Sequence, residues 1–185
     1  MRPSQPHDLC SILREQPEWY EALRASERHF GVSLPLQLAV IHQESSFDST
    51  ARPPRGTFLW VFPGARVSSA YGYGQVLDGT WDWYEDSRGG TLASRDDFAD
   101  VTDFLGWYGW IGETKFGIPR NDAYAYYASY HEGHRGYLRG DHRRKPFVRR
   151  AAQAVERRTR QYAVQYARCR RELEASLEGH WWWPG

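Results

Sequence analysis

Apolar residues recur at helical spacing in the first quarter of the chain. Trp19, Leu23 and Phe30 lie on one face of residues 18–30, and Gly31 follows as a residue suited to end a helix. The next segment, 33–47, has Ser33 as a candidate N-cap and an apolar periodic run after it. The pattern therefore predicts two successive helices, of which the second is expected to be the central one.

One carboxylate interrupts the apolar face of this second predicted helix. Leu36, Val40, Glu44 and Phe47 fall at i, i+4, i+8 and i+11, which predicts a continuous stripe with Glu44 on the buried side. A helix-end carboxylate that is satisfied by an arginine or by backbone amides is one interpretation. The other is a general acid, because low polarity and the negative end of the helix dipole both raise the pKa of a carboxyl group.

The remainder of the chain is predicted to be mainly helical after one irregular segment. Residues 48–76 are too rich in Pro and Gly for a long helix and predict a loop with short strands. Helices are predicted over 78–87, from Ser94 and Asp97 to about 117, from a candidate cap at Asn121 to about Gly133, and over about 146–178. In the last of these, Val148, Val155, Tyr162 and Cys169 repeat every seven residues and predict its inner face.

Composition predicts one domain over residues 1–185. The chain is 41% hydrophobic and 16% aromatic with nine Trp, enough for a core and for a groove that stacks flat ligands. A net charge of +1 argues against a general binder of polyanions. Without a run of about 18 apolar residues, neither a transmembrane segment nor an N-terminal signal peptide is expected in this chain.

Cys10 and Cys169 are the two cysteines of the chain, and no CxxC spacing suggests a zinc site or redox catalysis. Spacing alone leaves two reduced core thiols and one disulfide equally open. In an oxidising compartment, a disulfide would close most of the chain into a loop, which the chain-entropy treatment values at up to about 5 kcal/mol.

Three motifs occur in a family-like order: "ESSFDSTA", then "AYGYGQV" with "TW" beyond it, then "YASYHEG". Together they resemble the soluble lytic transglycosylase (SLT) domain of the goose-type lysozyme-like superfamily, over roughly residues 34–140. The resemblance implies a mainly α, lysozyme-like α+β domain. A small irregular or β wall is expected beside a catalytic groove, between the Glu44 helix and the "AYGYGQV" segment.

The resemblance also implies roles for individual residues. Glu44 matches the single catalytic acid of the family, and Gln75 matches the glutamine that lines the sugar groove. Tyr130 matches the tyrosine close to the catalytic carboxyl group. Ser68 or Ser69 is expected to contact the N-acetyl region of the substrate, and the spacing does not choose between them.

This chain departs from the family pattern in two places. About a dozen additional residues, mainly "RPPRGTFLWVFPG", separate Glu44 from Gln75 and are expected to reshape one wall of the groove. His131 stands where the family has Asn, which puts that substrate contact in question. The glycines around Tyr73 are expected to let the backbone approach a bulky ligand, and Tyr73 itself is expected either to pack in the core or to stack on a sugar.

The resemblance implies cleavage of the β-1,4 bond between MurNAc and GlcNAc in peptidoglycan. Hydrolysis of a glycoside needs two carboxylates, and Asp48 is more typical of a capping or solvated residue than of a second one. In the family, the 6-hydroxyl of MurNAc attacks its own C1 and gives a 1,6-anhydro product. Glu44 would act first as acid and then as base, with no metal and no cofactor.

The segment "HEGH", residues 131–134, is not expected to bind zinc. The zinc motif HExxH needs a second His four residues after the first, and Arg135 stands there in this chain.

Other functions compete with this prediction: a hydrolytic muramidase, a peptidoglycan-binding scaffold with little activity, an exported wall-degrading toxin, or an enzyme that cleaves chitin. The substrate places the protein in the periplasm or outside the cell, with the targeting segment absent from this chain. In that compartment, a disulfide between Cys10 and Cys169 becomes the expectation.

Arginines crowd the segment from Arg143 to Arg171, which predicts either a solvated helix face, the favoured interpretation, or docking on an anionic surface. Nucleic acid is not an expected partner, because no aromatic platform interleaves with the arginines. Wall carboxylates or lipid headgroups fit better. The terminal "HWWWPG" is expected either to pack against the domain or to touch a membrane interface or a partner.

Overall fold

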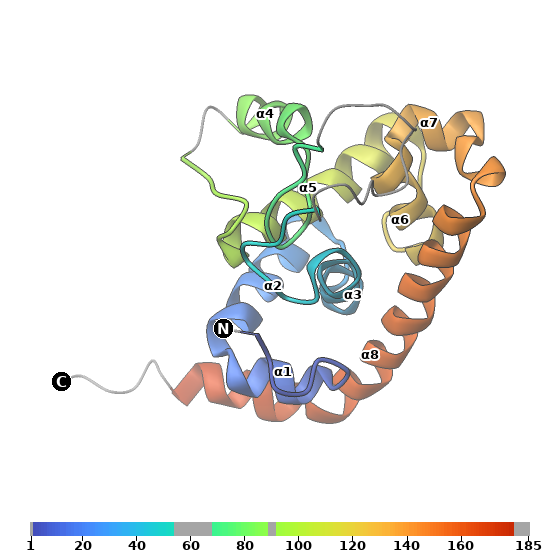
Figure 1. Cartoon of the computed structure of the whole chain (residues 1–185). Coiled ribbons are helices and arrows are strands. Elements are labelled where there is room, and N and C mark those ends of the chain that lie inside the picture. The colour runs from blue at the N-terminus through green and yellow to red at the C-terminus, as the bar shows by residue number, and fades with distance from the viewer. Residues whose placement is uncertain (1, 54–67, 89–91, 180–185) are drawn as a thin grey trace.

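The computed structural model describes residues 2–53, 68–88 and 92–179, and these are mainly helical (Figure 1). The α-helices are α1 (Leu9–Glu15), α2 (Pro17–Phe30), α3 (Leu34–Ser45), α4 (Asp78–Ser87), α5 (Phe98–Phe116), α6 (Ala123–Glu132), α7 (His134–Arg139) and α8 (Pro146–Gly179), with a 3₁₀ turn, η1 (Asp141–Arg144), before α8. None of the helices in the described part of the chain is both long and apolar enough to cross a membrane.

Helix α3 lies at the centre of the fold and contacts α2, α5 and α8 (Figure 1). Every residue from Leu34 to His42 is buried, so the helix is enclosed on all sides and not along one stripe. The helix also ends at Ser45, so that Phe47 lies beyond it. The predicted stripe is therefore corrected in both respects, while the expected central place of this helix agrees with the structure.

Helix α8 curves around one side of the molecule, from α6 past α3 to α1 (Figure 1). Its bounds differ from the predicted 146–178 by one residue. Val148, Val155 and Tyr162 are fully buried on its inner side, as their spacing of seven residues predicts. Helix α8 thereby holds α1, α3 and α6 together.

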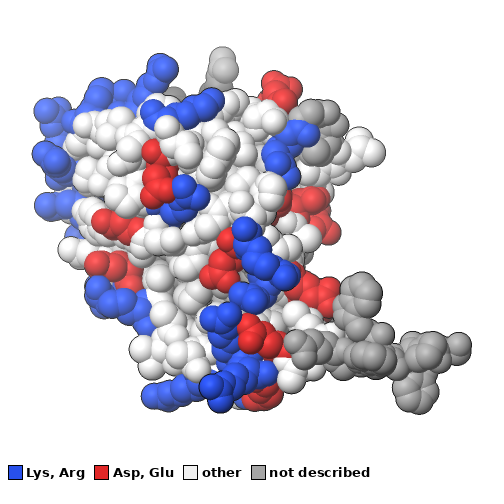
Figure 2. All heavy atoms as spheres, turned by 180° about the vertical axis from the view of Figure 1, so that it is seen from behind, with Lys and Arg blue, Asp and Glu red and all other residues white. Residues whose placement is uncertain are grey.

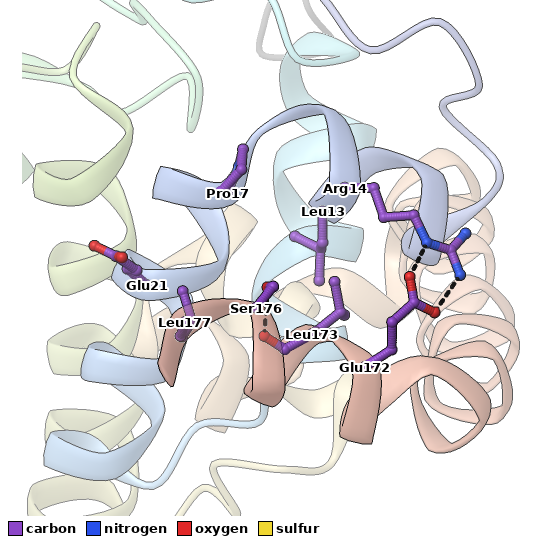
Figure 3. A pocket seen from close by; sticks show the side chains of 8 residues that line it. All are labelled: Leu13, Arg14, Pro17, Glu21, Glu172, Leu173, Ser176 and Leu177. Atoms are coloured by element: carbon purple, nitrogen blue, oxygen red, sulfur yellow. Dashed lines mark hydrogen bonds and ion pairs between the residues drawn. The ribbon is translucent and has the colours of Figure 1, made fainter. Parts of the chain in front are cut away.

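A disulfide joins Cys10 in α1 to Cys169 in α8, and the two positions are 159 residues apart in sequence. One turn of helix away, Arg14 Nε and Nη2 donate to the two carboxylate oxygens of Glu172 at 2.7 and 2.8 Å. A cavity of about 160 Å³ lies beside this ion pair, between the α1–α2 junction and the end of α8 (Figure 3). Its apolar lining includes Leu13 and Leu173, and its elements are not those that carry the predicted site.

The expected β wall is not present in the described residues. Within 48–53 and 68–77 the one β feature is an isolated antiparallel bridge between Tyr71 and Val76, in which Tyr71 N donates to Val76 O at 3.3 Å. A single bridge closes a turn and provides no strand for a neighbour to pair with. The prediction of short strands also covered residues 54–67, which lie outside the described residues.

Two predicted helix caps differ from the structure. The spacing of Ser94 and Asp97 predicts a capping box with Ser94 at the N-cap, but α5 begins at Phe98, and Asp97 is its N-cap and accepts from Asp100 N at 3.1 Å. The prediction of Asn121 as a cap is wrong, because Asp122 caps α6 through a bond from Ala125 N. Asn121 instead accepts from Ser33 N and donates to Gly31 O, each at 2.8 Å, and so ties the α2–α3 loop to the segment before α6.

Candidate active site

Glu44 is the penultimate residue of α3, and the chain reverses sharply just after it. Ser46 and Phe47 both have positive φ, 50° and 65°, a conformation that costs a residue such as Phe about 1–3 kcal/mol. Phe47 is only 1% exposed, and its ring stacks on Trp19 with centroids 5.8 Å apart. Burial of this aromatic ring offsets the backbone strain and fixes where the Glu44 helix ends.

The carboxyl group of Glu44 is enclosed by protein, although the residue as a whole keeps intermediate solvent exposure. Burial raises its pKa from the ordinary 4.5 to about 7, because the ionised form loses hydration. A hydrogen bond with the side chain of Tyr127 acts in the opposite direction and lowers this pKa. At neutral pH, Glu44 is therefore divided between its protonated and ionised forms.

Tyr127 is a site residue that the sequence analysis did not name. It lies in α6, three residues before Tyr130, and the two rings are nearly parallel with centroids 6.4 Å apart. Residues three apart share a face of a helix, so this spacing could have indicated Tyr127 once Tyr130 was chosen. Burial raises the pKa of both hydroxyl groups well above 10, and the charge of Glu44 raises them further.

The charge of Glu44 raises the pKa of Tyr130, so the two side chains lie near each other. The hydroxyl of Tyr130 nevertheless donates to Gly74 O, at 2.7 Å. A Cβ atom on Gly74 would come within 2.9 Å of that hydroxyl oxygen. Glycine at this position therefore lets the turn approach α6, and the bond joins the "AYGYGQV" segment to the helix that carries Tyr127.

Gly72 has φ of +78°, and a Cβ atom there would lie 1.9 Å from Arg95 O. Its N–H donates to Ala51 O at 3.0 Å, and the neighbouring Tyr73 N donates to Arg95 O at 3.1 Å. The close neighbours of Gly72 and Gly74 are thus protein atoms, and the expected approach of a bulky ligand to this backbone stays a prediction.

Gln75 joins the turn to the segment after α3. Its Nε2 donates to Ala51 O at 2.8 Å and to Gly72 O at 3.0 Å, and its backbone has φ of 49°. Both amide hydrogens are used within the protein, so the carbonyl oxygen is the part of Gln75 that remains for a ligand. The predicted contact with sugar stays a prediction.

Three further residues predicted to contact the substrate, Ser68, Ser69 and Tyr73, make contacts within the protein. Ser69 Oγ accepts from Asp78 N at 3.1 Å at the start of α4, and Ser68 Oγ accepts from Ala70 N at 3.2 Å. Tyr73 is 6% exposed and packs edge-on against Trp19, with centroids 5.7 Å apart. This packing favours the core role for Tyr73 over stacking on a sugar, while Ser68 and Ser69 remain equal candidates.

His131 belongs to a small ionic cluster at the end of α6. Its Nδ1 lies 3.1 Å from Glu132 Oε1, and its ring packs edge-on against Phe147. Lys145 Nζ contacts the other carboxylate oxygen of Glu132 at 2.8 Å. Burial lowers the pKa of His131, more than the neighbouring Glu132 raises it. The position where the family has Asn is thus tied to the start of α8.

The other carboxylates near these motifs are engaged elsewhere. Asp48 accepts from Thr50 N at 3.0 Å and pairs with Arg2, and these bonds lower its pKa. Asp48 thus closes a local turn and pairs with an arginine, and it does not cap a helix. Glu132 is held by Lys145. Among the described residues, no carboxylate contributes to the raised pKa of Glu44.

The "HEGH" segment places its histidines in different surroundings. His134 is stacked between the rings of Tyr108 and Phe116, at 4.1 and 4.8 Å, and its Nε2 lies 3.2 Å from Tyr108 O. Within the described ranges, no three His, Cys, Asp or Glu residues are grouped as metal ligands. Residues 54–67, which link the two sides of the predicted groove, lie outside the described residues, so the groove itself stays a prediction.

Comparison with known proteins agrees with the motifs and with the helical fold. Residues 1–169 match the family described as the transglycosylase SLT domain. No curated protein and no solved structure matches the chain. The matched region includes Glu44, the "AYGYGQV" turn, α6 and most of α8. The chain therefore belongs to the transglycosylase SLT domain family.

Proposed function

We propose that this protein cleaves the β-1,4 bond between MurNAc and GlcNAc in peptidoglycan without consuming water, and leaves a 1,6-anhydroMurNAc end. Family membership supports a transglycosylase-type enzyme with peptidoglycan as its substrate. The observation that carries the specific reaction is Glu44: an enclosed carboxyl group with a pKa of about 7, whose one hydrogen-bond partner affecting this pKa is a tyrosine hydroxyl.

Both proton transfers can be assigned to this one group. Protonated Glu44 donates its proton to the glycosidic oxygen as the bond from that oxygen to C1 of MurNAc breaks. The resulting carboxylate then accepts the proton of the MurNAc 6-hydroxyl while O6 bonds to C1. Glu44 ends in the protonated form in which it began. A pKa near the working pH suits a group that must act as acid and then as base.

The partners and positions of the other carboxylates support this reaction over hydrolysis. A hydrolase of the usual kind places a second carboxylate about 5–9 Å from the acid, as nucleophile or as base for water. Asp48 and Glu132 have other partners in the described residues. The sequence has no Asp or Glu between Asp48 and Asp78, so the additional residues before Gln75 contribute no second carboxylate.

Tyr127 is proposed to orient the Glu44 carboxyl group for these two steps. A hydrogen bond from the hydroxyl to one carboxylate oxygen leaves the other oxygen to exchange protons with the substrate. The bond from Tyr130 to Gly74 O holds the "AYGYGQV" turn beside the same helix. The orientation of the acid would thus be set by α6, while burial is the main determinant of its protonation state.

Product analysis on purified sacculi tests the proposal. Mass spectrometry should detect anhydromuropeptides from the wild-type digest and none from Glu44→Gln. Muropeptides with reducing ends would show a hydrolytic muramidase instead. Binding to sacculi without soluble products would favour a scaffold. Because the substrate lies outside the cytoplasm and the structure contains a disulfide, we place the protein in the periplasm or outside the cell.

A further inference from the structure

Charge is strongly segregated along this chain. Residues 142–171 hold 11 of its 24 Lys and Arg but one of its 23 Asp and Glu, a net of +10 against −9 for all other residues. The overall charge of +1 therefore conceals a strongly cationic segment. Most of this segment is the first part of α8, together with the turn η1 before it.

The cations of α8 form an exposed ridge on its outer side. We define the arginine ridge as the exposed residues Arg149, Arg150, Arg157, Arg160, Arg168 and Arg171. Arg150 and Arg157 follow the buried Val148 and Val155 by two positions, which places them about opposite the inner face. Seen from behind, Lys and Arg gather along the edge of the molecule that α8 forms (Figure 2).

Little within the described residues neutralises this ridge. Arg160 pairs with Glu156 at 3.2 Å, and it is the one ridge arginine with an ion pair among those residues. A solvated helix normally mixes both signs of charge, because pairs four residues apart are favourable when opposite and unfavourable when alike. Glu172 and Glu174 follow Arg168 and Arg171 by four and three positions, but they pair with cations outside the ridge. The ridge therefore retains repulsion that an anionic partner would relieve.

The ridge also faces away from the candidate active site. The inner face of α8 contacts α3 and α6, which carry Glu44 and Tyr127. A partner bound to the outer face would therefore leave the opposite side of the molecule free for a glycan strand. This arrangement separates the ridge from any contact that substrate makes at Glu44.

We propose that the arginine ridge binds the anionic surface of a phospholipid bilayer. Each Lys or Arg near an anionic leaflet contributes to partitioning about fivefold. The sequence continues beyond α8 with Trp181, Trp182 and Trp183, a residue type that favours the bilayer interface. Single-stranded nucleic acid is bound through aromatic side chains that stack on its bases, whereas the exposed large apolar residue within residues 142–171 is Val164.

Sedimentation with vesicles tests this proposal without any measurement of activity, so its outcome does not depend on the proposed reaction. The full chain, with its disulfide intact, is mixed with vesicles of phosphatidylglycerol and phosphatidylcholine or of phosphatidylcholine alone. The test variant is Arg150→Glu/Arg157→Glu. The control, Arg28→Glu/Lys115→Glu, changes net charge by the same amount at exposed positions outside α8. Arg and Glu have similar helix propensities, and circular dichroism checks that both variants fold.

Wild type should bind the anionic vesicles and not the neutral ones, and salt should weaken the binding. The ridge variant should lose at least about 25-fold in partitioning, while the control should change less than about threefold. Equal losses in the two variants, or a wild type that does not bind anionic vesicles, would overturn the proposal. Ridge-dependent binding to sacculi or to duplex DNA but not to vesicles would assign the surface to another polyanion.

A variant without the tryptophans gives a second test in the same vesicle experiment. Replacement of Trp181, Trp182 and Trp183 by Ala leaves the arginine ridge intact and should weaken binding to anionic vesicles at least tenfold. Unchanged binding in this variant, together with the loss expected in Arg150→Glu/Arg157→Glu, would assign attachment to the arginine ridge alone.

Discussion

The side chains of Tyr127, in α6, and Glu44, at the end of α3, interact, which lowers the pKa of Glu44 and raises that of Tyr127. The hydroxyl of Tyr130, on the same helix, donates to a backbone oxygen of the neighbouring turn. The tyrosine that the family resemblance implies thus lies near the acid, while a different one changes the pKa of the acid. This division between two adjacent tyrosines can be tested.

Tyr127→Phe should move the alkaline limb of the pH–rate profile upward. The hydrogen bond from Tyr127 lowers the pKa of Glu44, so its loss raises that pKa above the present value of about 7. A hydrogen bond to a charged group contributes about 1.5–3 kcal/mol, which corresponds to a displacement of about 1–2 pH units. The rate of anhydromuropeptide release from pH 4 to pH 9 is the measurement.

Tyr130→Phe is the matched control for this experiment. It removes a hydroxyl from the same face of the same helix, but the bond that it loses ends on Gly74 O. Its pH–rate profile should keep its alkaline midpoint while thermal stability falls by about 1–3 kcal/mol. If Tyr130→Phe moves the midpoint and Tyr127→Phe does not, the assignment of the two tyrosines is reversed.

Glu44 should make the protein less stable as pH rises. Its folded pKa of about 7 exceeds the ordinary 4.5, so the native state binds the proton more tightly than the unfolded state does. This contribution is fully present below pH 4.5 and is lost as pH rises through 7, by up to about 3 kcal/mol. Glu44→Gln lacks this dependence, so its stability relative to wild type should increase between pH 4.5 and pH 8.

Urea unfolding at pH 4.5 and pH 8 measures the contribution of Glu44 to the free energy of unfolding. Glu18→Gln, which removes an exposed carboxyl group from α2, is the control and should leave the pH dependence of wild type nearly unchanged. A wild-type protein and a Glu44→Gln variant whose stabilities differ by the same amount at pH 4.5 and pH 8 would contradict a raised pKa.

Reduction of the bond between Cys10 and Cys169 should destabilise the protein by up to about 5 kcal/mol. The disulfide connects positions 159 residues apart and so removes a large loop from the freedom of the unfolded chain. Urea unfolding with and without dithiothreitol measures the difference. Cys10→Ser/Cys169→Ser should resemble the reduced protein and should not respond to dithiothreitol. A wild type that is insensitive to reductant would contradict this prediction.

Gly72→Ala should be severely destabilising, while Gly79→Ala should be neutral or mildly stabilising. Gly72 combines φ of +78° with a Cβ position 1.9 Å from Arg95 O, so an added methyl group forces the backbone apart. Gly79 lies in α4 with nothing within 4 Å of its Cβ position, and Ala favours helix by about 1 kcal/mol over Gly. Thermal unfolding compares them. Equal effects would show that the turn does not need glycine.

The sequence by itself determined most of the helical segments, although not α1 or α7, and the residue that is the candidate acid. The predicted helix over 78–87 has the bounds of α4, and α8 follows its seven-residue apolar repeat, because helix formation depends on spacing within a few turns. Glu44 could be named because a carboxylate in an otherwise apolar helix is anomalous within a single segment. The family motifs likewise occupy short stretches.

The tertiary structure decided which groups meet. Tyr127 interacts with a residue 83 positions earlier in the chain, Gln75 gives both amide hydrogens to backbone oxygens, and Gly72 and Gly74 lie against protein atoms that a side chain would displace. Residues Leu34 to His42 of α3 are buried on every side because α2, α5 and α8 surround them, while Gln43 near the end of the helix is exposed. Such partners lie far apart in sequence, and only packing brings them together.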